Sequence, residues 1–510
     1  MLFGLLVWNQ QETITKQLSS TTSSSSSHKD SSDDSHHHTS VVVEEKPAPT
    51  ETGDAPSVPS TISDDSDGSN DSIDDTGNGK TKPRFWTSKG HLLPSVWNYK
   101  RPENIHKIMG LVFYGRRQPV SILDCYLKRN LKKNGGMLDG VIFVERTSEP
   151  RDLALLDRMM KSEPDYEKWH IEMGDNNQFS SGFGNSYERI KDDVLYIKID
   201  DDIVFMEDSV IPSIIQKRVQ HPEYYIVSAN VVNQPLLSWV HWNLQAIHPY
   251  LPELNKTSRI PGTEIDWRAS KLPQWEGPDL EEFNLDDWEP EDGDRVHRWL
   301  PVGHEKRHHI LDHTPIENTE YHPYGRGWTQ WKIGAQEHFS FLENLEKDEL
   351  FHYKFGTWDF QYDRMGIQFV AMMGKDINAA KPIEADDENH FSCTMTRQLG
   401  RHAVADGRGI AVHYSFGSQR GGMDRTDILE RYRAFARENI CEDPMLWSPE
   451  QEEREIKEEQ ERKKKEEEKK KQQEEAKKKE EERKKQEQQK QQKEQKEQAA
   501  RIKQEEENLP

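Results

Sequence analysis

The sequence has few cysteines and no long apolar run. Three of its 510 residues are cysteine, Cys125, Cys393 and Cys441. Because they are far apart and odd in number, they predict no disulfide framework, and at most one bridge could form. No apolar run approaches the roughly 20 residues of a membrane-spanning helix. The apolar opening MLFGLLVW lacks a basic flank and therefore does not predict a signal peptide.

Basic residues are in deficit. The chain carries 69 Lys and Arg against 92 Asp and Glu, which gives a formal net charge of −23. General nucleic-acid binding requires a basic surface that neutralises phosphates, so we expect no nucleic-acid partner. Hydrophobic residues are also scarce, at 33% of the chain. This average combines two polar ends with a centre of ordinary globular composition.

The two ends lack apolar periodicity. Ser, Thr, Asp and Gly dominate the first end, which cannot offset its ordering entropy by burial, so we predict a disordered segment over 1–85. From 449 to 510 the chain is almost wholly Glu, Lys, Gln and Arg, with opposite charges three or four residues apart. That pattern predicts a solitary charged helix, and the absence of an apolar heptad seam argues against a stable coiled coil. The catalytic domain is expected over 86–448.

The centre alternates apolar runs with helical patterns. Strands are predicted at 107–114, 140–145, 169–173, 194–199, 203–205, 224–232 and 367–373, and helices follow most of them. Alternation of this kind predicts an α/β fold, with a largely parallel sheet covered by helices on both faces. Residues 240–330 are dense in Trp, Pro, His and acidic residues, and we expect long loops there.

Three consecutive aspartates stand at the end of a predicted buried strand. The run from Val194 to Ile199 leads into Asp200, Asp201 and Asp202, and a second apolar run follows at once. Carboxylates at the carboxyl end of a strand face the crevice in which open α/β sheets bind ligands. Three so close repel one another, and a hard divalent cation relieves that repulsion. We therefore predict a metal site, with a solvated acidic turn as the alternative.

Other acidic and histidine clusters have a plainer interpretation. The pairs at 65–67 and 292–294 also read Asp-x-Asp, but no predicted strand precedes either. The four histidines at 304, 308, 309 and 313 include two pairs at i, i+4. No helix-borne Glu lies between them to support zinc, so a polar loop is favoured.

The order of five motifs along the chain carries a family resemblance. They are YIKIDDDIVF, VSANVV, AIHPYLPE, HYSFGSQR and TDILERYR. The first resembles the DxD motif of GT-A glycosyltransferases, especially the DDD form of galactosyltransferase- and fringe-like enzymes. The whole set is similar to fungal glycosyltransferase-like proteins and covers residues 105–437. The resemblance implies a GT-A-like, Rossmann-related sheet.

The resemblance also implies a metal shell. Asp200 and Asp202 would hold Mn²⁺ or Mg²⁺, which in turn holds the phosphates of the donor. GT-A enzymes commonly add a late histidine to this shell, and IAVHYSF places His413 at the end of an apolar strand. A satisfied core histidine is the alternative for His413.

The donor would meet residues next to that shell. Arg116 and Arg117 follow the first strand and are placed to bind phosphate bidentately, or else form a solvated basic turn. We assign Asp201 to the same donor site. Arg420 and Arg425 are further phosphate candidates, with an ordinary surface role as the alternative.

A second acidic motif supplies the candidate general base. GT-A enzymes carry such a motif on the acceptor side, and here PIEADDENHF offers Asp386, Asp387 and Glu388, preceded by Glu384. The order ADDE departs from the family's usual Glu-Asp. We favour Asp387 and keep Asp386 and Glu388 open, with a solvated acidic loop as the alternative to all three.

The expected function is transfer of a sugar from a UDP- or GDP-sugar to a hydroxyl of a glycan or protein acceptor, with inversion favoured. One alternative is a nucleotidyltransferase, although GRRQP is poor in Gly for its signature loop. Another is a catalytically silent interaction protein. The resemblance implies the Golgi or secretory pathway, yet no amino-terminal anchor is visible.

Overall fold

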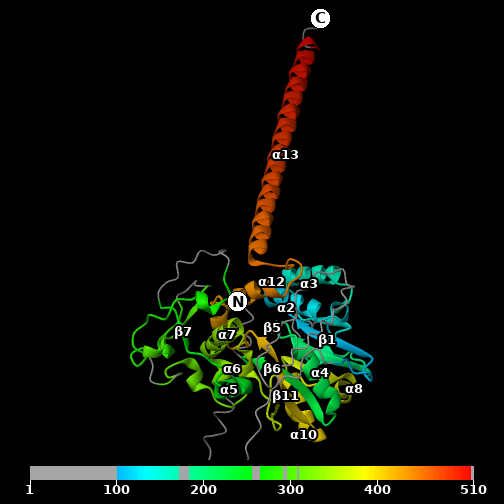
Figure 1. Ribbon diagram of the computed structural model, residues 1–510. Coiled ribbons are helices and arrows are strands. Elements are labelled where there is room, and N and C mark those ends of the chain that lie inside the picture. Colours follow the sequence, from blue (N-terminus) through cyan, green and yellow to red (C-terminus); the bar gives the residue numbers. More distant parts are fainter. Residues whose placement is uncertain are drawn as a thin grey trace, which may run out of the picture. The chain divides into compact units, whose positions relative to one another are not determined.

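The computed structural model describes residues 100–171, 183–254, 265–290, 296–306, 309 and 311–506. The predicted disordered segment lies outside these residues. The centre of the molecule is a nine-stranded sheet in the order β3-β2-β1-β4-β10-β6-β11-β5, with β9 paired to β11 (Figure 1). Its strands are β1 Lys107–Tyr114, β2 Gly140–Glu145, β3 Tyr166–Trp169, β4 Val194–Asp200, β5 Ile203–Met206, β6 Tyr224–Val232, β9 Thr357–Asp359, β10 Phe369–Met373 and β11 His402–His413. A separate hairpin-like pair consists of β7 Tyr250–Pro252 and β8 Trp299–Pro301.

Helices connect and cover these strands. Their bounds are α2 Arg117–Arg129, α3 Pro150–Ser162, α4 Val210–Gln220, α5 Pro235–Asn243, α6 Arg326–Thr329, α7 Trp331–Glu346, α8 Gly374–Ala379, α9 Asp387–Asn389, α10 Thr396–Leu399, α11 Arg420–Met423, α12 Ile428–Asn439 and α13 Pro449–Glu506. A π-helical segment, His390–Met395, joins α9 to α10. In the described part of the chain, no helix is both long and apolar enough to cross a membrane.

The sheet is mixed but mostly parallel in direction. β1 pairs in parallel with β2 and β4, β2 with β3, and β6 with β11. β10 lies antiparallel between β4 and β6, so those two strands point the same way. β5 and β9 run antiparallel to β11. β1 and β6 are buried at almost every residue, so both faces of the sheet are covered, as the apolar runs predicted.

Two local predictions need correction. The third strand is Tyr166–Trp169 rather than 169–173, because its pairing with β2 begins at Tyr166. The apolar period predicts Leu153, Leu156 and Met160 as the buried face of α3. Leu156 is buried as predicted, but Leu155 and Met159 complete the buried face, while Leu153 and Met160 are partly exposed. The buried stripe is rotated because α3 packs between α2 and β3.

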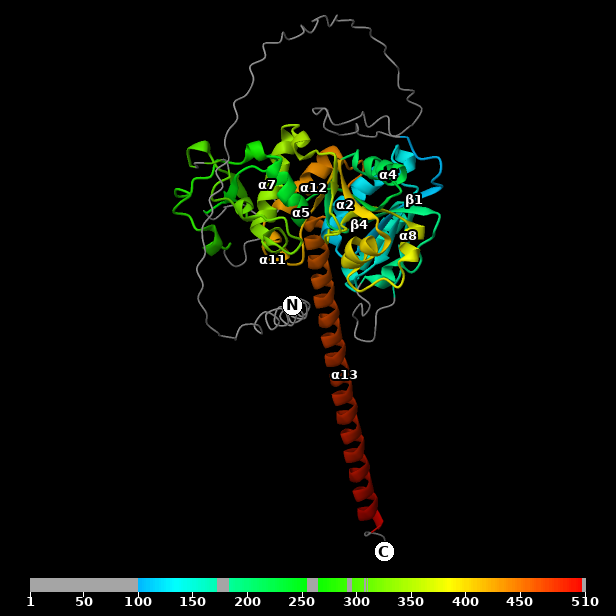
Figure 2. The same ribbon diagram turned by 90° about the horizontal axis from the view of Figure 1, so that it is seen from below.

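The charged tail is the single helix α13, as predicted. Figures 1 and 2 both show its first turns beside α12 and α2. A disulfide joins Cys125 of α2 to Cys441, just after α12, and Cys393 is free and buried. The one bridge that the cysteine count allowed is therefore present. Residues 240–330 consist mainly of loops, and their described histidines join no metal-binding group among the described residues.

Candidate metal and donor site

The site lies where strands of one direction end. β1 and β4 are parallel neighbours, and their register places Phe113 opposite Asp200. β11 runs in the same direction and ends at His413. A β-bulge after Val412 pairs His413 with Ile203 of β5, and the backbone N–H of Tyr414 donates to the Asp202 carbonyl at 2.9 Å. The return strand β5 thus places His413 beside the aspartate triplet.

Among the described residues, Asp200, Asp202 and His413 form a group that could hold a metal ion, and we call it the metal-binding group. Their ligand atoms all lie within 4.8 Å of one another. His413 Nε2 is 3.4 Å from Asp202 Oδ1, and both side chains are buried. His413 Nδ1 donates to the backbone oxygen of Asn233 at 3.2 Å, which leaves Nε2 facing the carboxylates. Carboxylate oxygens with one imidazole nitrogen fit a divalent cation such as Mn²⁺ or Mg²⁺.

The middle aspartate has another task. Asp201 Oδ2 accepts the backbone N–H of Gly115 at 2.8 Å, and Asp201 also pairs with Arg116. Arg116 Nη2 lies 2.9 Å from Asp202 Oδ2. Burial raises the pKa of Asp201, whereas for Asp202 the charges of Arg116 and His413 outweigh burial and lower the pKa. Asp202 is therefore held ionised while Asp201 fastens the loop after β1. Sequence reasoning assigned Asp201 to the donor, and the structure adds this anchoring contact.

Two of the predicted phosphate-binding arginines are engaged elsewhere. Arg117 pairs with Asp152 at 2.8 Å and with Glu452 of α13, and does not contact the triplet. Arg425 donates to the carbonyl of Pro290. Arg116 is the arginine that reaches the aspartates.

Lys198 is a site residue that sequence reasoning missed. It lies two residues before Asp200 on the same face of β4 and forms an ion pair with that carboxylate. Its side chain is 5% exposed. Burial opposes its charge, but Asp200 and Asp387 raise the pKa of Lys198 overall. The sequence contained a signal for this residue. Side chains two residues apart on a strand lie on the same face, and a buried Lys needs an acidic partner, which Asp200 provides.

The second acidic motif is close enough to Lys198 and Asp200 for Asp387 to interact electrostatically with both, and its three carboxylates differ. Asp387 is 5% exposed and accepts a hydrogen bond from the Tyr187 hydroxyl at 2.7 Å. Burial raises the pKa of Asp387, against the opposing effects of Lys198 and Tyr187. Glu388 pairs with Arg364 at 2.6 Å. Asp386 is half exposed, pairs with Arg364 at 3.0 Å and caps α9.

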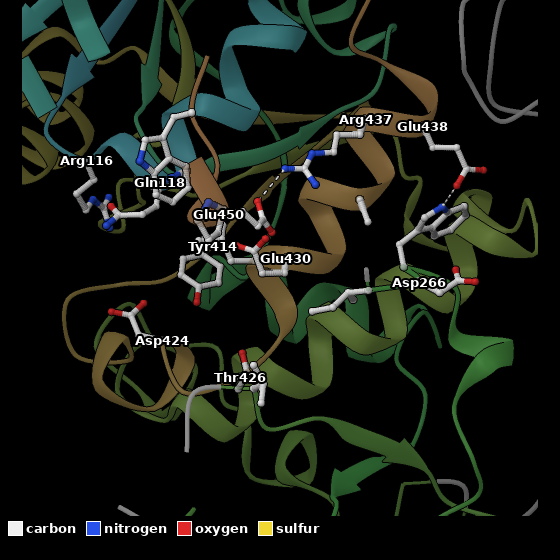
Figure 3. Close-up of a pocket in the computed structure, with 18 of the residues that line it drawn as sticks. Arg116, Gln118, Asp266, Tyr414, Asp424, Thr426, Glu430, Arg437, Glu438 and Glu450 are labelled. Atoms are coloured by element: carbon white, nitrogen blue, oxygen red, sulfur yellow. Dashed lines mark hydrogen bonds and ion pairs between the residues drawn. The ribbon is translucent and has the colours of Figure 1, made fainter. Parts of the chain in front are cut away.

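A pocket of about 970 Å³ opens beside Arg116 (Figure 3). Near the triplet it is lined by Tyr414, Arg420 and Asp424. Side chains of α12 form another wall, among them Glu430, Arg437 and Glu438, and the start of α13 adds Glu450. It is large enough for a nucleotide-sized ligand.

No family model matches the sequence, and no curated protein matches it. Among solved structures, the chain shows a likeness to 4-diphosphocytidyl-2C-methyl-D-erythritol synthase from Anaerococcus prevotii, with a TM-score of 0.18 and 10% sequence identity. The match covers 25% of this chain and 54% of that chain, so the chain spans about half the length of the protein it matches. A likeness this low assigns neither a family nor a function. What stands is a mixed α/β protein with an aspartate-rich, metal-compatible site.

Proposed function

We propose that this protein is a divalent-metal-dependent glycosyltransferase that uses a nucleotide-activated sugar. The observation that carries the proposal is the convergence of Asp200, Asp202 and His413 at the carboxyl ends of β4 and β11, next to Arg116, which pairs with Asp202 and lines the pocket of about 970 Å³. A site that combines a metal shell, a phosphate-binding arginine and a nucleotide-sized cavity fits a nucleoside diphosphate donor.

Different residues of the chain would contact different parts of the donor. Asp200, Asp202 and His413 would hold the cation, which supplies Lewis-acid stabilisation for the charge that develops on the leaving diphosphate. Arg116 would exchange its contacts with Asp201 and Asp202 for phosphate oxygens, since a guanidinium binds either group bidentately. Arg420, exposed in the same pocket, would bind the second phosphate.

The acidic motif would act on the acceptor. For an inverting transfer, one carboxylate accepts the proton of the attacking hydroxyl on the face opposite the leaving group. We propose Asp387 for this role, because it is buried, interacts electrostatically with Lys198 and Asp200, and has a pKa that burial raises. Asp386 and Glu388 are the alternatives.

Synergy between metal and diphosphate tests the donor site. With Mn²⁺ plus UDP or GDP, the full chain should melt at a higher temperature than with either alone, because ligands that share one site raise each other's affinity. Asp202→Asn should abolish that synergy while changing the unliganded melting temperature little. Asp157→Asn, on an exposed carboxylate of α3, is the matched control and should keep the synergy. Full synergy in Asp202→Asn would remove the metal from the triplet.

The released product distinguishes a glycosyltransferase from a nucleotidyltransferase. A glycosyltransferase releases a nucleoside diphosphate from a nucleotide sugar, whereas a nucleotidyltransferase releases pyrophosphate from a nucleoside triphosphate. We expect the first, measured across a panel of UDP- and GDP-sugars. A silent interaction protein would release neither product and would show no synergy.

We also propose that the protein works in the secretory pathway. The Cys125–Cys441 disulfide is of the kind that persists in oxidising compartments. A glycan on the sequon at Asn255, which lies outside the described residues, would establish that compartment in protein isolated from its source cells.

A further inference from the structure

An aromatic side chain is exposed close to the candidate site. Tyr324 is 49% exposed, the highest value for an aromatic residue in the described chain. Its ring meets that of Trp328, which is partly exposed, edge to face at 5.8 Å. We call Tyr324, Trp328 and Phe416 the aromatic rim.

One end of the rim reaches the metal-binding group. The ring of Phe416 lies 4.5 Å from that of His413. Two residues further on, the Ser418 hydroxyl donates to the carbonyl of Trp328. The loop that carries Phe416 is therefore hydrogen-bonded to Trp328, whose ring contacts Tyr324.

Hydrogen bonds fix the position of this end. The side chain of Gln419 donates to the Gly327 carbonyl at 3.0 Å and to the Asn233 side chain at 3.1 Å. Asn233 also accepts from His413 through its backbone oxygen. The segment that carries Trp328 is thus tied to the residue that orients His413.

The other end of the rim reaches the acidic motif. The guanidinium of Arg364 lies 5.1 Å from the centre of the Tyr324 ring. The same guanidinium pairs with Glu388 at 2.6 Å and with Asp386 at 3.0 Å. Contacts therefore link the Tyr324–Trp328 pair on one side to the loop that follows His413 and on the other side, through Arg364, to the alternative candidate bases Asp386 and Glu388.

The chemistry of the rim identifies the ligand. A pyranose ring presents C–H groups that pack on the negative face of an aromatic ring, and hydroxyls that need hydrogen-bond partners at its edge. Tyr324 and Trp328 offer the faces, and Asp386 and Arg364 offer the partners. A lipid acceptor would leave these two charged groups facing apolar surface, at a desolvation cost.

We propose that the aromatic rim binds a sugar ring of a saccharide acceptor, with Tyr324 as the principal stacking residue. The inference rests on the proposed function, because it names the class of acceptor for the same site. It assigns a binding role to Tyr324 and Trp328 of the loop-rich region 240–330.

Saccharide binding tests the rim. Saturation-transfer NMR on the full chain, with Mn²⁺ and UDP present, would measure affinity for disaccharides of mannose, galactose and glucose. At least one should bind, and Tyr324→Ala should weaken it by about tenfold or more, the scale of one aromatic contact. Tyr324→Phe should bind within about twofold of the wild type, since it keeps the ring. Tyr362→Ala is the aromatic control, because Tyr362 contacts His402 at the opposite end of β11.

The metal–nucleotide synergy separates the two proposals. All Tyr324 and Tyr362 variants should keep it, because the rim is not part of the donor site. Saccharide binding that survives Tyr324→Ala unchanged would overturn the assignment, as would binding of a Ser/Thr-rich peptide with no binding of any disaccharide. Absence of synergy in the wild type would instead count against the proposed function, and the disaccharide titration would still decide the rim.

Discussion

At the residue scale, three consecutive aspartates have three environments. Asp200 forms an ion pair with Lys198, Asp201 accepts a hydrogen bond from the backbone N–H of Gly115, and Asp202 lies beside His413. Identical side chains therefore do different work because alternate residues of the strand end point to different neighbours.

Asp387→Asn should separate binding from turnover. We expect near-normal affinity for Mn²⁺ and the nucleoside diphosphate, with turnover reduced by roughly a hundredfold or more, the usual scale for a general base. Donor affinity and product release, measured on the same preparation, provide the check. Loss of nucleotide affinity equal to that of Asp202→Ala would place Asp387 in the metal shell. Normal turnover would pass the role to Asp386 or Glu388, or indicate a retaining mechanism.

Glu337 should make stability fall as pH rises. This carboxyl of α7 is fully buried beside Ser238, and burial raises its pKa from 4.5 to about 8. Between those pH values the folded state holds a proton that the unfolded state has lost, so unfolding becomes easier by up to about 1.4 kcal/mol per pH unit. Denaturant titrations from pH 5 to 8 should show this slope in the wild type and a flatter one in Glu337→Gln.

Glu343 on the same helix is the control of opposite sign. Although burial opposes it, contacts with His248, Lys347 and Tyr250 lower the pKa of Glu343 to about 2. Its stabilisation is present above pH 4.5 and is lost as pH falls toward 2. Glu343→Gln should therefore leave the slope between pH 5 and 8 unchanged. An equal effect of both variants in that window would rule out Glu337 as its origin.

At the element scale, α13 has two parts. Its first turns contact the globular core: Glu452 pairs with Arg117 and Arg151 and accepts from the Trp447 indole at 2.9 Å. Glu450 lines the large pocket. Beyond Glu459 the described helix is exposed, and i, i+4 ion pairs such as Lys471–Glu467 and Lys484–Glu480 support it. We therefore propose that the domain boundary lies near residue 460 rather than at 448.

Two truncations should behave differently. A chain ending at 460 should keep the stability and nucleotide affinity of the full chain, because it retains the contacts of Glu452. A chain ending at 448 should lose about 1–3 kcal/mol, since Arg117 then keeps only one of its two carboxylate partners. Guanidinium denaturation and nucleotide titration measure both, with Glu452→Gln as a point variant in the same direction. Equal stability of the two truncations would return the boundary to 448.

At the scale of the whole molecule, one covalent link closes most of the described chain. The Cys125–Cys441 bridge spans 316 residues and fixes α2 to the segment after α12. A double Cys125→Ala, Cys441→Ala variant should lose about 2–4 kcal/mol, the usual contribution of a disulfide. In denaturant, alkylation without reductant should label only Cys393, and with reductant all three cysteines. Three labelled cysteines without reductant would show that the bridge is absent.

The sequence by itself determined the local elements. Continuous apolar runs predicted β1, β2 and β6 with their observed bounds, and the charge pattern predicted α13. It also placed the aspartate triplet at a strand end. These features depend on burial and periodicity, which neighbouring residues along the chain carry.

Only the tertiary structure decided which distant segments meet. The antiparallel pairing of β5 with β11 brings His413 to Asp202. The position of β10 between β4 and β6 sets the strand order of the sheet. Arg117 pairs with Glu452 of α13 and does not contact the aspartates. Lys198 joined the site for the same reason, because its partners Asp200 and Asp387 are far apart in sequence. Such pairings are selected by the packing of the whole molecule, since each strand could satisfy its hydrogen bonds with more than one neighbour.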